Sequence, residues 1–107
     1  MNEKLILTLE LADNSDLIHE YENLHKNVWK EILEGIKSVG IVDMQIFRWQ
    51  TRLVMLIEVD ENFNFDLQMQ KLAILPRQQQ WEQLMWKFQK ELIKGKKWVK
   101  MDQIFKL

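Results

Sequence analysis

The chain has no cysteine, one proline and three glycines among its 107 residues. The lack of cysteine excludes disulfides and thiolate catalysis and gives no sign of an oxidising compartment, so we expect the cytoplasm. Three glycines leave little room for a phosphate-binding loop or a dinucleotide fingerprint, and we expect no cofactor of that kind. A formal net charge of −1 provides no general attraction to nucleic acid or to an anionic membrane, and neither is an expected partner.

The composition predicts one packed domain, which we place at residues 1–107. Apolar residues make up 47% and charged residues 29% of the chain, close to ordinary globular proteins. A second core would leave each half near the size at which hydrophobic burial barely suffices. Residues 1–11 are too short and too charged for a signal peptide or a membrane span.

Hydrophobic periodicity predicts alternating strands and helices. Alternation over 5–11 predicts a strand, and the capping residues at 13–16 begin a helix whose apolar stripe continues to near Gly40. Residues 42–49 and 52–59 favour a hairpin joined at 50–51. The stretch 61–76 fits either a short helix or an ordered loop, and Pro76 marks a boundary before a helix over 77–94. Residues 101–107 predict a last strand.

This order of strand, helix, strand, strand, helix, strand is that of the α+β ferredoxin-like fold, βαββαβ. Two helices cover one face of such a sheet and leave the other face without a partner. We therefore expect a homodimer in which two sheets meet face to face as a dimeric α/β barrel.

His25 is the residue whose position carries most information about chemistry. It lies in the predicted helical stripe, four residues after Tyr21 and four before Trp29, so all three are predicted to share one face. An imidazole among apolar neighbours can titrate near neutrality and move protons in either direction. A histidine packed in the core with one hydrogen bond is the alternative, and Trp29 can equally be a core residue.

Glu58 is a candidate general base. It lies between Ile57 and Val59 in a predicted strand that is otherwise apolar, where a carboxyl group must be paired or must face a cavity. The alternative is a solvated strand end or a pair with a lysine.

Two further kinds of site are poorly supported. His19 and His25 are six residues apart, on different helical faces, so we expect no metal site. Four lysines around Trp98 form a patch that could bind single-stranded nucleic acid, but lysines after a helix C-terminus also neutralise the helix dipole without any ligand. These lysines are Lys94, Lys96, Lys97 and Lys100.

The whole chain resembles the L-rhamnose mutarotase family. The resemblance rests on the segment Glu20 to Trp29, with its tyrosine, histidine and tryptophan spaced by four, on Trp81 and on the terminal segment 103–107. It implies a ferredoxin-like dimer that binds a monosaccharide, with His25 as proton donor and with Tyr21 and Trp81 as substrate contacts.

The sequence departs from the family pattern at two positions. The pocket tyrosine of the family appears here as Met44, and the second of two paired tryptophans appears as Glu82. Both positions are expected to contact substrate. The departures affect the identity of the sugar more than the reaction, so L-fucose becomes a rival to L-rhamnose.

We therefore predict a mutarotase that interconverts the anomers of a deoxyhexose by acid–base ring opening, without a metal or redox cofactor. Two alternatives stay open at this point. One is a cofactor-free monooxygenase of the same dimeric barrel architecture, which would consume oxygen. The other is a non-catalytic dimer that binds a carbohydrate without accelerating exchange.

Overall fold

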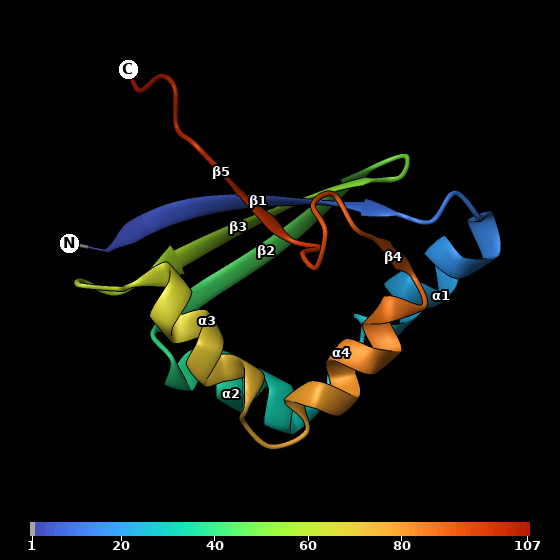
Figure 1. Cartoon of the computed structure of the whole chain (residues 1–107), viewed down its shortest axis with the longest axis horizontal. Helices are drawn as coiled ribbons and strands as arrows, with labels where there is room; N and C mark the ends of the chain where they lie inside the picture. The colour runs from blue at the N-terminus through green and yellow to red at the C-terminus, as the bar shows by residue number, and fades with distance from the viewer. Residues whose placement is uncertain (1) are drawn as a thin grey trace.

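The structure is a computed structural model that describes residues 2–107. A sheet of order β2-β3-β1-β4, with β5 also paired to β1, carries all four helices on one side (Figure 1). Every strand pair is antiparallel. The elements in chain order are β1 (Glu3–Leu11), α1 (Ser15–Leu24), α2 (Lys30–Ser38), β2 (Ile41–Trp49), β3 (Arg52–Val59), α3 (Phe65–Ala73), α4 (Gln78–Trp86), β4 (Gln89–Lys90) and β5 (Val99–Met101).

The strand alternation predicted for residues 5–11 places its leucines on the helix-covered face. Leu7, Leu9 and Leu11 are buried, whereas Thr8 and Glu10 between them are partly exposed. The hairpin of β2 and β3 is confirmed, and its turn at Gln50 adopts a positive φ of 52°. The α+β ferredoxin-like fold is therefore confirmed.

The prediction of one long helix before Gly40 is wrong. The helix ends at Leu24, and a second helix begins at Lys30 after a turn. At the break the backbone changes to i→i−3 bonds, from Lys26 to Asn23 at 3.2 Å and from Asn27 to Leu24 at 3.4 Å. The His25 ring adds a bond there, because its Nδ1 lies 2.8 Å from the Tyr21 carbonyl oxygen. Side-chain bonds of this kind compete with the helical ladder. Gly40 has a φ of +99°, and a Cβ there would lie 2.8 Å from the Asp60 carboxylate.

The second predicted helix is shorter than expected, and the stretch before it is helical. Residues 65–73 form α3, whose N-cap Asn64 accepts a hydrogen bond from the Leu67 backbone at 3.0 Å. The helix α4 ends at Trp86 rather than near residue 94. Beyond it, Phe88 is 1% exposed in the core, and Gln89 pairs with Leu11 of the sheet. Burial of Phe88 and pairing with β1 together redirect the chain.

The predicted last strand is confirmed only in its first residue. The strand β5 covers Val99–Met101, and residues 102–107 have no regular structure. The tail leaves the body of the molecule (Figure 1), so it has no strand to pair with.

Two groups of buried side chains fill the space between sheet and helices. The first, which we call the aromatic end, contains Leu9, Leu11, Tyr21, Ile32, Leu53, Trp81, Met85 and Phe88. The second, the aliphatic end, contains Leu7, Val39, Ile41, Ile57 and Val59. The candidate site residues Tyr21 and Trp81 belong to the aromatic end.

Candidate active site

The break between α1 and α2 fixes the orientation of the His25 ring. Its Nδ1 is 2.8 Å from the carbonyl oxygen of Tyr21. Because a carbonyl oxygen can only accept a hydrogen bond, Nδ1 carries a hydrogen, and Nε2 is left as the atom that gains or loses a proton. Burial lowers the pKa of His25 below its usual 6.5. A neutral imidazole is therefore the main form at pH 7.

Four of the predicted site residues lie together as a ladder of aromatic rings. The Tyr21 ring is 4.3 Å from the His25 ring, measured between centroids. The His25 ring meets Trp81 edge-on at 5.6 Å, and Trp29 meets Trp81 edge-on at 5.1 Å. The ladder connects α1, the start of α2 and α4, and its aromatic rings could stack against the C–H surface of a sugar.

A network of polar side chains lies on the α4 side of this ladder. The buried polar residues of the described chain are Gln78, Gln89 and Lys97. Lys97 Nζ donates to the backbone oxygen of Gln89 at 2.8 Å and lies 3.5 Å above the Trp86 ring. The Gln89 side chain hydrogen-bonds Tyr21, whose pKa burial raises to about 12. The phenol of Tyr21 is thus neutral and held in place.

Glu82 belongs to the same network. Its Oε1 accepts a hydrogen bond from the amide of Gln78 at 2.8 Å. Loss of solvent around the carboxyl raises its pKa above 4.5, although Gln78 and the charge of Lys97 act in the opposite direction. The charge of Glu82 also acts on Tyr21, so the carboxylate lies close to the tyrosine of the ring ladder.

Met44 lies at a pocket of about 430 Å³ that also borders His25. This volume is within the range of about 300–1,000 Å³ that is common for small-molecule sites. Its wall is mostly apolar and comes from the turn after α1, from α2 and from the edge strand β2. The other residues that line it are Val28, Leu33, Ile36, Lys37, Ile41, Val42, Asp43 and Ile46.

The structure does not bring Glu58 to the other candidates. Ile57 is 1% exposed on the helix-covered face of the sheet, so Glu58 lies on the opposite face. There its carboxylate accepts a hydrogen bond from Asn2 at 3.1 Å. Asp43 pairs with Glu58 across the two strands, next to a bulge in β2, and it also borders the pocket of His25 and Met44.

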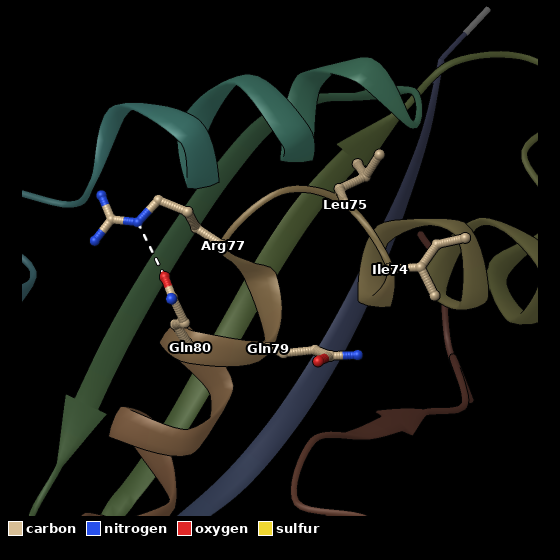
Figure 2. A pocket seen from close by; sticks show the side chains of 5 residues that line it. All are labelled: Ile74, Leu75, Arg77, Gln79 and Gln80. Carbon is tan, nitrogen blue, oxygen red and sulfur yellow. Dashed lines mark hydrogen bonds between the residues drawn. The ribbon is translucent and has the colours of Figure 1, made fainter.

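A second pocket, of about 300 Å³, lies where α3 is followed by α4 (Figure 2). It is lined by Ile74, Leu75, Arg77, Gln79 and Gln80. Arg77 donates to Gln80 at 3.2 Å, and its guanidinium lies 4.0 Å above the Trp29 ring. None of these five side chains is an acid or base that exchanges protons near neutral pH.

Reasoning from the sequence missed the three buried polar residues. Lys97 was assigned to a solvated basic patch, and the two glutamines had no assigned role. One signal was available, because Gln78 stands three residues before Trp81 and four before Glu82, on one face of a helix. No such pattern marks Gln89 or Lys97, which reach the site through the turns around β4.

Among residues 2–107, no three acidic or histidine side chains are arranged to hold a metal ion. Within the same range, none of the helices has the length and apolar content that crossing a bilayer requires.

Comparison with known structures shows the same fold in other proteins. An L-rhamnose mutarotase from Formosa agariphila superimposes with a TM-score of 0.74 over 98% of both chains, at 17% identity. A tetracenomycin F2 cyclase from Streptomyces glaucescens gives a TM-score of 0.65 over 98% of this chain and 96% of that one, at 13% identity. At such low identity these matches establish the fold alone.

The sequence itself establishes the family. An L-fucose mutarotase from Xanthomonas campestris pv. campestris is 39% identical over 110 residues, which cover 98% of this chain and 88% of that protein. A protein from Dictyostelium discoideum is 38% identical over 106 residues, which cover 92% and 85%. The family model for L-rhamnose mutarotase matches residues 4–107. The chain therefore belongs to the L-rhamnose mutarotase family.

Proposed function

We propose that the protein is an isomerase that interconverts the α and β anomers of a deoxyhexose of the L-rhamnose or L-fucose type. The observation that carries the proposal is the tethered ring of His25, which borders a pocket large enough for a monosaccharide and has its Nδ1 occupied by the Tyr21 carbonyl. Membership of the L-rhamnose mutarotase family, and a relative named as an L-fucose mutarotase, support the same reaction.

Mutarotation needs only proton transfer at two oxygens. The bond between the anomeric carbon and the ring oxygen breaks while the ring oxygen takes a proton and the anomeric hydroxyl loses one. The open-chain aldehyde then rotates and recloses on its other face. In this proposal His25 supplies the proton from Nε2, and its Nδ1–H bond to Tyr21 stabilises the charged ring.

The aromatic ladder and Met44 shape the site around that proton transfer. Tyr21 and Trp81 contact the sugar through the faces and polar edges of their rings. Met44 forms part of the apolar wall and is placed to meet the C–H surface or the methyl group of the deoxyhexose. Trp29 supports Trp81 from the side at 5.1 Å.

Saturation-transfer NMR on L-rhamnose and L-fucose tests this function, because it reports the exchange between anomers directly. We expect faster exchange with the wild type for at least one of the two sugars. His25→Ala is expected to lose about a hundredfold or more of that acceleration. The exposed His19 provides the matched control, His19→Ala, which should leave exchange unchanged. A wild type that accelerates exchange of neither sugar would contradict the proposal.

We also propose that the protein acts as a homodimer joined through the open face of its sheet. No helix of the described chain covers that face (Figure 1). On this face Phe47 is 57% exposed and Trp49 73%, both on β2, and Met101 on β5 is 40% exposed. The tail also exposes Ile104, Phe105 and Leu107. Apolar area of this kind is typical of an interface.

Sedimentation of the wild type and of Phe47→Glu tests the dimer. The wild type should sediment as a dimer, and a charge on the open face should shift it toward the monomer. Leu33→Glu, on the helix side at 46% exposure, is the control and should stay dimeric. A wild type that is monomeric at all concentrations would rule out this interface.

A further inference from the structure

The reaction needs a second proton relay besides His25, and several carboxylates near His25 are already paired with cations. Around the aromatic end the acidic side chains form exposed ion pairs with arginine or lysine. These pairs are Glu10 with Arg52, Glu20 with Lys87, Glu22 with Arg48 and Glu31 with Arg77. Glu58 lies on the far face of the sheet, where it accepts a hydrogen bond from Asn2. Asp43, at the rim of the His25 pocket, accepts a hydrogen bond from Gln45 at 3.1 Å.

Glu82 differs from them in its position and in its partner. The residues Gln78, Trp81, Glu82 and Met85 follow the spacing of one helical face, and the other three are buried. Glu82 therefore lies next to the stripe that packs against the ring ladder. Its partner is the neutral amide of Gln78, at 2.8 Å, rather than a cation in direct contact. The residue as a whole is exposed, so a ligand can reach the carboxylate.

We infer that Glu82 is the second catalytic residue, and that the sugar extends from the pocket at His25 across the edge of Trp81 to Glu82. This inference rests on the proposed mutarotase function. The neighbouring amides of Gln78 and Gln89 and the phenol of Tyr21 are the donors and acceptors that sugar hydroxyls require. The hydrogen bonds of this network hold its donors and acceptors in fixed positions, which is what the binding of a polar ligand requires.

The proton balance of the step is as follows. Nε2–H of the His25 imidazolium gives its proton to the ring oxygen, while the Glu82 carboxylate takes the proton of the anomeric hydroxyl. The electron pair of the broken bond stays on the ring oxygen, and the anomeric carbon becomes an aldehyde. Reclosure on the other face returns one proton to each group, so the enzyme is unchanged.

The environments of the two groups support this pairing. Burial lowers the pKa of His25 and raises the pKa of Glu82. The two values therefore approach each other, which eases proton transfer in both directions. The groups that face Glu82 are Gln78 on its own helix, Tyr21 on α1 and the ammonium of Lys97 after β4. Lys97 supplies the charge that keeps the carboxylate ionised.

Glu82→Gln tests the inference, because the amide keeps the size and the bond to Gln78 but cannot accept a proton. We expect the turnover rate of anomer exchange, measured by saturation-transfer NMR, to fall about a hundredfold, with KM changed much less. Glu82→Asp should recover part of the rate. Glu34→Gln, an exposed residue of α2 paired with Lys30, is the matched control and should exchange like the wild type.

The pH profile gives a readout that a purely structural role would not move. The productive form holds one proton on His25 and none on Glu82, so the wild-type rate should rise as pH falls toward the His25 pKa and then fall as Glu82 is protonated. Glu82→Gln should lose the acidic limb. If the Glu82→Gln variant kept the wild-type rate, and its rate still fell at both low and high pH, the inference would be overturned while the mutarotase function would stand. A wild type without activity would overturn both.

Discussion

The two ends of the helix–sheet interface are built from different side chains. The aliphatic end contains no polar residue among its buried members, Leu7, Val39, Ile41, Ile57 and Val59. The aromatic end packs Tyr21 and Trp81 beside the buried polar residues Gln78, Gln89 and Lys97. Apolar packing needs no orientation, whereas buried amides and ammonium groups must each find a partner. The first end is held by apolar packing alone, whereas the second end also depends on hydrogen bonds that fix the orientation of its side chains.

The largest expected effect on stability comes from the aliphatic end. Ile57 is 1% exposed, and Ile57→Ala should lower the free energy of unfolding by about 2–5 kcal/mol, because it leaves a cavity among close-packed aliphatic side chains. Urea denaturation measures the loss. Anomer exchange per folded molecule should stay close to that of the wild type. Ile74→Ala, at a residue 78% exposed, is the control and should change stability by no more than about 0.5 kcal/mol.

If Ile57→Ala abolished exchange in molecules shown to be folded, the division between the two ends would be wrong, and the whole interface would serve catalysis.

A smaller effect on stability and a specific effect on activity are expected at Tyr21. Tyr21→Phe keeps the ring stack on His25 but removes the hydroxyl that is bonded to Gln89. The free energy of unfolding should fall by about 1 kcal/mol, the size of one hydrogen bond. Anomer exchange should slow by about tenfold, since a lost bond to the sugar of similar strength has that effect. Parallel urea titrations and saturation-transfer NMR separate the two.

A Tyr21→Phe variant that is destabilised but exchanges at the wild-type rate would limit Tyr21 to packing.

Much of the fold follows from local patterns in the sequence. The leucine alternation of residues 5–11 and the apolar runs at 42–49 and 52–59 correspond to three paired strands. The helix break after Leu24 could not be predicted in this way, because the apolar spacing continues through Val28 to Ile32. It appears only in the backbone hydrogen bonds, which change to i→i−3 at Lys26 and Asn27. The early end of α4 depends on the tertiary burial of Phe88.

The site was predictable where its residues share one segment. Tyr21 and His25 come from one turn of helix, and their spacing alone indicated a common face. Trp81 was predicted as a substrate contact only from the family resemblance, because its contact with His25 joins residues more than fifty positions apart. Glu58 illustrates the limit. Its strand follows from the sequence, but the sequence does not indicate that its carboxylate bonds Asn2 on the face away from the helices.

The smallest expected effect is the pH dependence of stability at the aromatic end. The folded-state pKa of His25 lies below its unfolded value of 6.5 because burial disfavours the charged ring. The unfolded chain therefore binds the proton more readily than the folded one. Stability from this group is fully present above pH 6.5 and is lost as pH falls from there through the lowered pKa. Burial raises the pKa of Glu82 above 4.5, so its contribution to stability changes with pH in the opposite direction. Its ionisation lowers the stability of the fold as pH rises from 4.5 through the raised pKa.

Thermal unfolding between pH 8 and pH 5.5 isolates the histidine contribution. The wild type should lose stability across this range, and His25→Gln should lose less of it, since glutamine carries no titrating group. His19 is exposed, so His19→Gln should follow the wild type. The aliphatic end holds no titrating side chain among its buried members. Ile57→Ala should therefore lower the melting temperature at every pH without changing how it depends on pH. A slope that survives in His25→Gln would mean that the proton is bound elsewhere, and would remove the link between the buried ring and the pH response.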